Sequence, residues 1–469
     1  MHVPIDAVGC GKYENAMTAR TLLQLAADLA AGRTHSRTLV EECLARIADT
    51  SGEGSRVFLK VEPEKAIAAA EYHDRMRHSG AAVSPFAGIP ITIKDLFDVC
   101  GEVTTAGSTV LRNSAPASQD AVSVARLRAA GFIPIGRTNM TEFAFSGLGL
   151  NPHYGTPLNP HDRGAARIPG GSSSGAAVSV TDGMAYAALG TDTGGSCRIP
   201  AALCGIVGFK PTARRVPLDG ALPLSESLDS IGPLASSVSC CAVLDAVLAG
   251  ETELGVTPLP VAGLRLAVPQ TVVLDGMDAN VAASFERALK TLANAGARIN
   301  EIPLKELAEL SQINRKGGFA APESYAFHRA RIATDASGYD PRVLSRIVRG
   351  KEQEAADYLD LQRQRTDFQR RVANIVAPYD ALLMPTVPIV APRVSELQQD
   401  DAYTRINMLV LRNPAIINFL DGCAISLPCH RAGDLPVGLM LTGTHGSDRR
   451  LLAIAEAVAP LLAPLSSGR

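Results

Sequence analysis

Two short clusters of glycine and hydroxyl residues lie close together in the chain. Residues 170–175 read GGSSSG and residues 190–196 read GTDTGGS, and the segment between them is mostly small and apolar. Such a segment predicts a helix and a strand buried on nearly every side, which would hold both clusters rigidly. Backbone N–H groups in a Gly-Gly-Ser turn are unhindered by a Cβ atom, as an oxyanion hole requires. Glycine and serine also mark ordinary turns, but two clusters so close together favour a catalytic site.

A lysine ends an apolar stretch far upstream of these clusters. Residues 88–93 read GIPITI, which predicts a buried strand, and Lys94 and Asp95 follow it. An ammonium group is costly to bury, so Lys94 either extends to the surface or takes part in chemistry. Burial beside uncharged hydroxyl groups would lower its pKa by roughly 2 to 3 units from about 10.4. The neutral amine could then deprotonate a serine hydroxyl, which is otherwise a poor nucleophile.

Two other nucleophiles are conceivable in the same region. Residues 171–175 fit the GxSxG pattern of a nucleophile elbow, but that elbow needs a strand directly before it and a catalytic histidine. Residues 163–169 are not strand-like and end in proline, and we expect His153 and His161 in loops. Cys197 has no histidine near it in the sequence, and a free cysteine usually behaves as a small hydrophobic residue. Both alternatives are therefore disfavoured.

The wider pattern predicts an α/β fold. A strand at 88–93, a helix at 121–130 and a strand at 132–136 form a βαβ-like alternation, and a long loop at 147–171 leads into the first serine cluster. No linker clearly divides the chain, so we expect one large domain. Other strands are expected at 57–61, 205–212, 264–268, 381–386, 424–428 and 437–441, and a strand leading into a helix at 302–310. Helices are expected within 18–49, at 62–76, 281–297 and 340–377, and from residue 447. Residues 223–235 are expected to be rich in turns.

Composition limits the classes of partner and the cellular compartment. The 45 basic and 47 acidic residues nearly cancel, so a nucleic-acid or anionic-membrane partner gets no support. Nine cysteines, an odd number without CxxC or zinc-like spacing, are expected to be buried thiols in a reducing compartment. The start of the chain lacks the pattern of a secretory signal, and no apolar run is long enough to span a membrane. We therefore expect a cytoplasmic protein.

Several motifs together resemble the amidase signature family. They are GIPITIKD at 88–95, GGSSSG at 170–175 and GTDTGGSCRIP at 190–200, and GFKPT at 208–212 and LMPT at 383–386 are also similar. The resemblance extends from about residue 18 to residue 462. It implies a Ser-cisSer-Lys triad. The matching positions are Ser196 as nucleophile, Ser172 as a bridging serine after a cis peptide bond, and Lys94 as base.

The same resemblance implies the fold and the surroundings of the triad. It implies a central twisted mixed sheet of about eleven strands covered on both faces by helices, and no metal or organic cofactor. The N-terminal extension would be residues 1–17 and the amidase signature domain residues 18–469, within which residues 262–378 could form a helical subdomain. Four backbone N–H groups would form the oxyanion hole, those of Thr193, Gly194, Gly195 and Ser196.

Three further residues are expected to support the nucleophile. Ser173 follows the bridging serine, and Asp192 and Arg198 flank Ser196. We expect Asp192 and Arg198 to hold the loop, either by pairing with each other or by bonding loop N–H groups. The alternative is that both are ordinary surface charges.

Two positions depart from the family pattern. Ser174 stands where many members carry glycine, which would narrow the space beside Ser172. Ile199 stands where the glutamine-tRNA-forming amidotransferase component of the family typically has a polar glutamine. The second departure argues against that specialised member and for a stand-alone amidase.

These observations lead to a functional hypothesis with two rivals. The protein is expected to hydrolyse a small or medium carboxamide to a carboxylate and ammonia or an amine, through an acyl-enzyme on Ser196. The first rival is the amidase component of a glutamyl-tRNA amidotransferase, which needs protein partners. The second is a non-catalytic binding protein on the same fold. The sequence leaves open which amide is used and the oligomeric state, for which a homodimer is one option.

Overall fold

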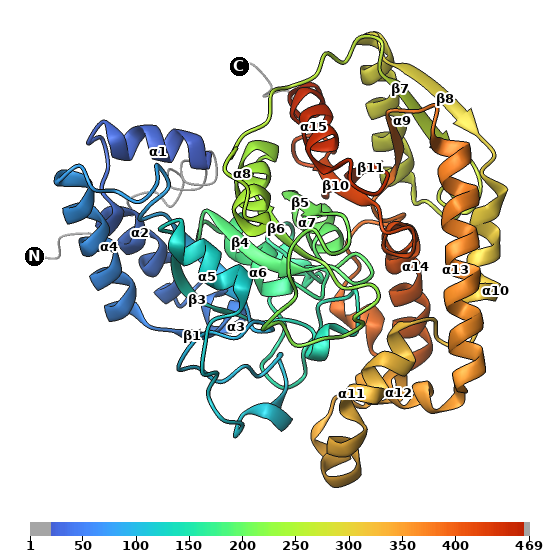
Figure 1. Cartoon of the computed structure of the whole chain (residues 1–469), viewed down its shortest axis with the longest axis horizontal. Coiled ribbons are helices and arrows are strands. Elements are labelled where there is room, and N and C mark those ends of the chain that lie inside the picture. The colour runs from blue at the N-terminus through green and yellow to red at the C-terminus, as the bar shows by residue number, and fades with distance from the viewer. Residues whose placement is uncertain (1–19, 464–469) are drawn as a thin grey trace, which may run out of the picture.

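Eleven strands join into one mixed sheet within residues 20–463, the part of the chain that the structure describes (Figure 1). The structure is a computed structural model. The extension expected at residues 1–17 lies outside the described residues. The strands stand in the order β1-β3-β2-β4-β6-β5-β10-β11-β9-β7-β8. Their bounds are β1 (Phe58–Val61), β2 (Pro90–Lys94), β3 (Ile133–Thr138), β4 (Ala187–Thr191), β5 (Val207–Lys210), β6 (Ile231–Ala235), β7 (Arg265–Pro269), β8 (Arg298–Ile302), β9 (Ala381–Pro385), β10 (Cys423–Pro428) and β11 (Gly438–Gly443).

Helices cover this sheet, which confirms the α/β fold and the mixed sheet of about eleven strands. Residues 262–378 supply β7 and β8 to the same sheet as the rest of the chain. The helices are α1 (Leu22–Ala30), α2 (Ser36–Ala48), α3 (Gly54–Val57), α4 (Pro63–His78), α5 (Val122–Ala129), α6 (Ser174–Thr181), α7 (Arg198–Cys204), α8 (Val238–Ala249), α9 (Ala279–Asn294), α10 (Leu310–Ile313), α11 (Ala320–Asp335), α12 (Pro341–Val348), α13 (Ala355–Val376), α14 (Asp400–Phe419) and α15 (Asp448–Leu462).

A parallel group of strands positions the two sequence clusters next to Lys94. β2, α5 and β3 form the expected βαβ unit, in which β2 and β3 pair in parallel. β2 also pairs in parallel with β4, with Ile93 opposite Leu189. The carboxyl ends of parallel strands meet at one edge of a sheet. Lys94, at the end of β2, is therefore brought beside the end of β4 and the glycine-rich turn that follows it.

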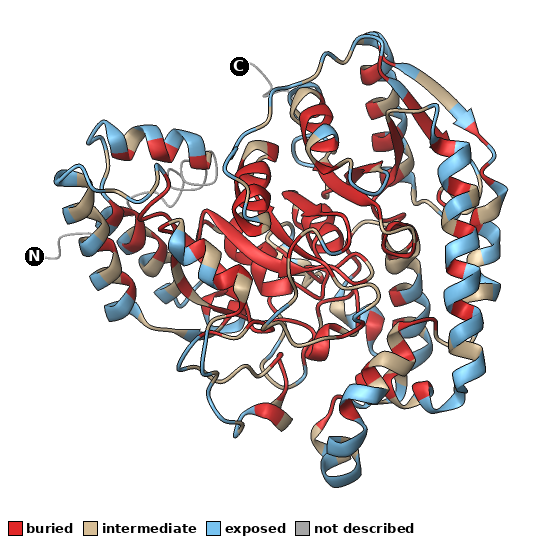
Figure 2. Ribbon diagram, in the orientation of Figure 1, coloured by how far each residue is buried: buried red, intermediate tan, exposed pale blue. Residues whose placement is uncertain are grey.

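The two faces of the sheet around β2 have different neighbours. On one face the hydroxyl groups of Thr92 and Ser179 of α6 lie 3.1 Å apart. On the other face Ile91 packs with Leu127 of α5 and Leu244 of α8. Because successive residues of a strand alternate between faces, Lys94 lies on the α6 side with Thr92. Figure 2 shows the buried residues concentrated on the central strands and the exposed ones on the outer helices.

Two predicted elements differ from the structure. The region expected to be turn-rich ends in β6, a central strand despite its Gly232 and Pro233. A Cβ atom at position 232 would lie 2.1 Å from the carbonyl oxygen of Phe209, so glycine is required there for close strand approach. Residues 340–377, expected to be helical, form two helices, α12 and α13, with an interruption between them. At Gly350, in this interruption, a Cβ atom would lie 2.3 Å from the carbonyl oxygen of Ala321.

Within residues 20–463, none of the helices combines the length and the apolar character needed to cross a membrane.

Candidate active site

Lys94 lies at the centre of a buried polar cluster. Its side chain is fully buried, so the alternative in which it extends to the surface is wrong. Its Nζ atom donates hydrogen bonds to Ser172 Oγ at 2.8 Å and to Thr191 Oγ1 at 2.7 Å. Burial lowers the pKa of Lys94 to about 8, because a charged ammonium group loses its hydration there. Neither contact is to a carboxylate, so the amine can lose its proton near neutral pH.

Ser172 is held by backbone contacts on both sides. The peptide bond between Gly171 and Ser172 is cis, as the resemblance implies. The N–H of Thr141 donates to the Ser172 carbonyl at 3.1 Å, and the N–H of Gly171 donates to the Gly147 carbonyl at 2.9 Å. A Cβ atom at position 171 would lie 2.6 Å from the backbone nitrogen of Gly149, so the close approach of these loops needs glycine. The 141–149 loop therefore fixes the position of the Ser172 hydroxyl.

The loop that carries Ser196 is organised around the carboxylate of Asp192. This carboxylate accepts hydrogen bonds from the N–H groups of Gly195, at 2.9 Å, and Cys197, at 3.1 Å. It also pairs with Arg198, whose Nη2 and Nε atoms lie 2.7 and 3.0 Å away. Both charged side chains are fully buried, so they are not surface charges. Although burial alone would raise the pKa of Asp192, Arg198 lowers it to about 2.

The hydrogen bonds of the loop that carries Ser196 occupy some of its backbone N–H groups and leave others free to bind an oxyanion. The N–H of Gly195 is engaged by Asp192, so it is not free to bind an oxyanion. Among the hydrogen bonds within residues 20–463, none uses the N–H of Thr193, Gly194 or Ser196. Ser196 itself is 3% exposed. Of the four N–H groups expected for an oxyanion hole, three therefore remain available.

Residues that the sequence did not single out complete the site. Asn418, at the end of α14, donates from Nδ2 to the carbonyl and carboxylate oxygens of Asp192, both at 2.9 Å, and accepts from Arg198. The Thr193 hydroxyl donates to Asp229 at 2.5 Å, and burial raises the pKa of Asp229 to about 6. Thr191 lies within the 190–196 cluster and could have been found there. Asn418 and Asp229 have no local sequence signal, because only the fold brings them to the loop.

The sequence motifs for a nucleophile elbow and a thiol nucleophile do not form such sites. No strand stands directly before residues 171–175, which form the bend at 171–173 and the first two residues of α6. In residues 20–463 no histidine hydrogen-bonds to Ser172 or Ser196. Cys197 is fully buried, and burial raises the pKa of its thiol, which keeps it protonated. Its Sγ atom contacts the Gly232 carbonyl at 3.5 Å.

Apolar side chains border the exposed side of the Ser196 loop. Gly194 is partly exposed, and a Cβ atom there would lie 3.4 Å from Leu411 Cδ2 of α14. The same Leu411 methyl would lie 3.3 Å from a Cβ atom at Gly147. Met408, one turn earlier on α14, is 64% exposed. An apolar stripe of α14 therefore leads from the surface to the loop that carries Ser196.

Comparison with known proteins assigns the chain to a family. The Amidase family profile matches residues 38–452. A 2-amino-5-chloromuconic acid deaminase of Comamonas testosteroni is 38% identical over 406 residues, which are 85% of this chain and 87% of that protein. The A subunit of glutamyl-tRNA(Gln) amidotransferase from Chloroflexus aggregans is 36% identical over 464 residues, 92% of this chain and 93% of that one. A crystal structure of an amidase superposes with a TM-score of 0.85 and 32% identity, covering 95% of this chain and all of the other.

This chain belongs to the amidase family. It is therefore an amidohydrolase, and the family assignment spans both glycine and serine clusters and Lys94. The relatives differ in their named activities, so membership of the amidase family does not by itself select a substrate or a partner.

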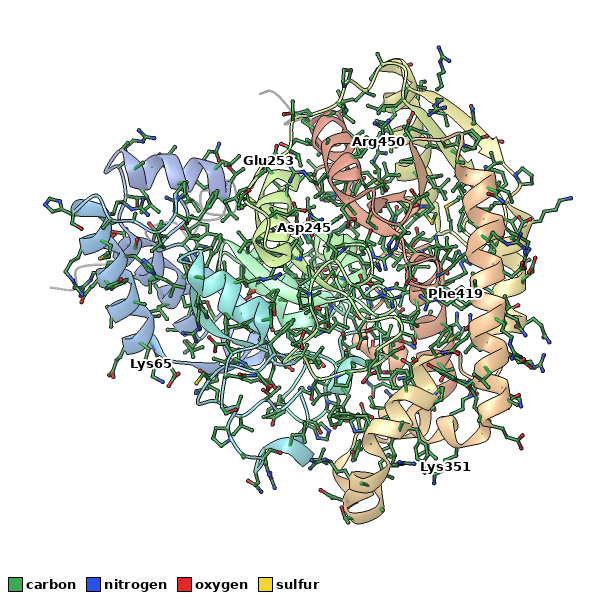
Figure 3. The ribbon with its side chains drawn as sticks, in the orientation of Figure 1. Lys65, Asp245, Glu253, Lys351, Phe419 and Arg450 are labelled. Atoms are coloured by element: carbon green, nitrogen blue, oxygen red, sulfur yellow. The ribbon has the colours of Figure 1, made fainter. Side chains whose placement is uncertain are left out.

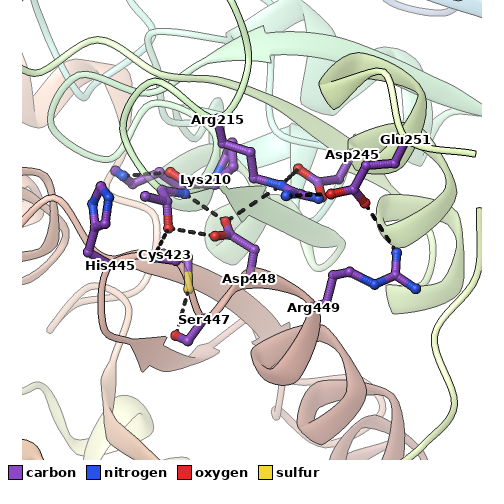
Figure 4. A network of polar contacts seen from close by, with 12 residues as sticks. Lys210, Arg215, Asp245, Glu251, Cys423, His445, Ser447, Asp448 and Arg449 are labelled. Atoms are coloured by element: carbon purple, nitrogen blue, oxygen red, sulfur yellow. Dashed lines mark hydrogen bonds and ion pairs between the residues drawn. The ribbon is translucent and has the colours of Figure 1, made fainter. Parts of the chain in front are cut away.

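A second lysine, Lys210, belongs to the polar network of Figure 4 and interacts with the charge of Asp192. Lys210, at the end of β5, is fully buried, and burial lowers its pKa to about 8, as for Lys94. Its Nζ atom donates to the carbonyl oxygens of Pro211, at 2.8 Å, and Gly422, at 2.7 Å. Carbonyl groups only accept hydrogen bonds, so they favour the charged ammonium form and offer no proton. Of the two buried lysines, Lys94 is the one that contacts hydroxyl groups.

Proposed function

We propose that this amidase-family enzyme hydrolyses a carboxamide through an acyl-enzyme on Ser196, with Lys94 as the base. The observation that carries the proposal is the 2.8 Å contact between the fully buried Lys94 amine and the Ser172 hydroxyl. A lysine with a pKa of about 8 is half neutral at pH 8, whereas a lysine of ordinary pKa is less than about 1% neutral there. The neutral amine has a lone pair that can accept the proton of Ser172.

In the first half of the reaction, Ser196 Oγ attacks the carbonyl carbon of the amide. Its proton passes to Ser172 Oγ as the Ser172 proton passes to Lys94 Nζ. The carbonyl oxygen gains negative charge, which the N–H groups of Thr193, Gly194 and Ser196 stabilise. The relay then runs backwards, and Ser172 protonates the leaving nitrogen. The C–N bond breaks, releasing ammonia or an amine and leaving an ester on Ser196.

In the second half, water repeats the attack on the ester. The relay takes a proton from the water and returns one to Ser196 Oγ, and the carboxylic acid leaves. Asp192, Arg198 and Asn418 do not touch the reacting atoms. They hold the loop so that the three N–H groups already point where the charge develops, which is the arrangement that lowers the barrier. Ser173 helps to join the two clusters, since its hydroxyl donates to the Thr191 carbonyl at 3.4 Å.

The surroundings of Ser196 support an amide with an apolar acyl group. Ile199 and Leu411 border the loop, and Met408 extends the same apolar stripe to the surface. A glutamine substrate would bring polar groups against these side chains, which costs free energy. We therefore propose a stand-alone amidase acting on a small apolar carboxamide, in preference to the amidase component of a glutamyl-tRNA amidotransferase. A homodimer and a cytoplasmic location stay predictions.

The test is ammonia release by the purified chain alone. The panel contains acetamide, hexanamide, phenylacetamide, glutamine and, because one relative is named a deaminase of a muconic acid, an aminomuconic acid. We expect hexanamide or phenylacetamide to be hydrolysed and Ser196→Ala to abolish the activity. Glutamine hydrolysis that appears only after partner proteins are added would contradict the proposal in favour of the amidotransferase. A wild-type protein that a fluorophosphonate probe cannot label at Ser196 would favour a non-catalytic protein.

A further inference from the structure

A cavity of about 590 Å³ lies between α13, the end of α14, the start of β9 and the end of β11. Val372 and Val376 of α13, Leu382 of β9 and Ile417 of α14 supply much of its apolar wall. These four side chains also belong to one hydrophobic cluster, so the wall continues directly into the core. Figure 3 labels Arg450 of α15, another residue of the lining.

Helix α14 stands between this cavity and the candidate active site. Leu411 and Asn418, two turns apart on α14, face the loop that carries Ser196. Ile417 and Leu420, which point from a different side of the same helix, line the cavity. The cavity is thus separate from the candidate active site, and a molecule bound in it would contact the end of the helix that supports the Ser196 loop.

The arginine and aspartate side chains that line the cavity are already paired. Within residues 20–463, each of them makes a hydrogen bond of 2.6 to 2.8 Å to a side chain of opposite charge. An ionic ligand would therefore find no unpaired charge among them, and it would lose its hydration without compensation. This balance favours an uncharged ligand. The pairs are Arg370 with Asp367, Arg450 with Asp380, and Asp421 with Arg365.

One hydroxyl group in the wall of the cavity lacks a partner. Thr442 of β11 is 3% exposed and lines the cavity. It lies on the same face of the sheet as Met440, whose side chain is packed in the hydrophobic cluster. In the described part of the chain, its Oγ1 atom makes no hydrogen bond. Because buried polar groups nearly always have a partner, this hydroxyl points to a ligand that bonds to it.

We propose that this cavity binds a small uncharged molecule with an apolar ring or chain and one hydroxyl group. The apolar part lies against Val372, Val376 and Ile417, and the hydroxyl bonds to Thr442 Oγ1. A hydroxyl both donates and accepts, so it matches the threonine hydroxyl in either direction. The volume lies within the range of about 300–1,000 Å³ that is common for small-molecule sites. The proposal does not depend on the reaction proposed for Ser196, because binding is measured without turnover.

The experiment compares four naphthalenes that differ in one substituent. The full chain is titrated at pH 7 with 2-naphthalenemethanol, 2-methylnaphthalene, 2-naphthoate and the ammonium form of 2-naphthylmethylamine, and binding is measured from naphthalene fluorescence and the melting temperature. We expect saturable binding of the alcohol, with a Kd about threefold to tenfold lower than that of the hydrocarbon, as one hydrogen bond allows. Both ions should bind at least about tenfold more weakly than the alcohol. Absence of saturable alcohol binding, or equal binding of either ion, overturns the proposal.

Neighbouring substitutions on α13 test the location. Ala373 is exposed and lines the cavity, so Ala373→Trp fills the space without disturbing the core and should weaken binding of the alcohol at least about tenfold. Asn374→Trp is the matched control, because Asn374 is also exposed but lies outside the lining. It should bind as the wild type does. Equal binding by the Ala373→Trp and Asn374→Trp proteins would contradict the proposal.

Thr442→Val tests the hydrogen bond. Valine keeps the shape of threonine but has no hydroxyl, so the variant should bind the alcohol and the hydrocarbon equally well. An unchanged preference for the alcohol would overturn the assigned contact. Hydrogen exchange of the wild type separates this cavity from the active site, since the alcohol should slow exchange in residues 369–376 and 417–422. Slowing confined to residues 193–196 and 408–411 would place the molecule beside Ser196 and contradict the proposal.

Discussion

Lys94 Nζ lies 2.8 Å from Ser172 Oγ, although the two residues are 78 positions apart in the chain. The contact arises because α6 packs against β2, where the hydroxyl groups of Thr92 and Ser179 lie 3.1 Å apart, and the turn that carries Ser172 directly precedes α6. The contact between Lys94 and Ser172 involves neither a carboxylate nor a histidine. It can work only if the lysine is neutral, and this requirement makes the mechanism testable.

Removal of either end of the relay should abolish activity. We expect Ser196→Ala and Lys94→Ala each to lower kcat by at least about a thousandfold, because residues that act as one unit lose nearly the whole effect when one is missing. Cys197→Ala is the matched control next to the nucleophile, and it should keep most of the activity. Amide hydrolysis measured by ammonia release checks all three. Loss of activity in the Cys197 variant, with retention in Lys94→Ala, would contradict the assignment.

The pH dependence of kcat/KM should reflect the pKa of Lys94. Because burial lowers the pKa of Lys94 to about 8 and the neutral form is the active one, kcat/KM should rise about tenfold per pH unit below pH 8 and level off above it. The measurement is kcat/KM for one amide between pH 6 and 10. An inflection near pH 6 would instead point to Asp229, whose pKa burial raises to about 6.

Asn418 should matter for the Ser196 loop more than for the fold as a whole. Asn418→Ala removes hydrogen bonds to the buried charges of Asp192 and Arg198, which should destabilise the protein by about 1–3 kcal/mol. A shift of the loop should also slow fluorophosphonate labelling of Ser196 by roughly tenfold to a hundredfold. Asn418→Asp should be worse still, since it sets a second carboxylate against Asp192.

Asn413 provides the control for this prediction. It is equally buried on α14, but it donates to the carbonyls of Val273 and Pro385, away from the Ser196 loop. Asn413→Ala should lower the melting temperature without slowing the labelling of Ser196. Equal labelling rates in the Asn418→Ala and Asn413→Ala proteins would show that Asn418 is only structural.

Leu411 should influence which acyl groups of the amide substrate the enzyme accepts. Leu411→Asp places a carboxylate against the apolar stripe, so kcat/KM for hexanamide should fall by roughly tenfold to a hundredfold while that for acetamide changes little. Arg405→Glu, which adds negative charge to an exposed face of the same helix, should leave the ratio of the two amides unchanged. A parallel loss for both amides in Leu411→Asp would mean that the acyl group does not reach this residue.

Much of the fold follows from local patterns. The apolar runs that became β2, β3 and β9, and the alternation of strand and helix around α5, are visible in the sequence because such strands are buried on both faces. β6 is not visible, because Gly232 and Pro233 are typical of turns and only their pairing with Gly190 and Leu189 of β4 makes them part of a strand. The interruption between α12 and α13 likewise depends on contact with α11 at Gly350.

The sequence by itself determined the candidate nucleophile loop and the lysine, because glycine, serine and a lysine ending an apolar strand are chemically informative wherever they are placed. The bridging role of Ser172 came from the resemblance to the amidase signature family. It also indicated that Asp192 and Arg198 support the loop. Only the tertiary structure decided that Lys94 rather than Lys210 contacts hydroxyl groups, that Asn418 completes the support, and that Gly195 has no free N–H. The reason is that pKa values and hydrogen-bond partners depend on which distant segments exclude water from a group, and a linear pattern does not specify those segments.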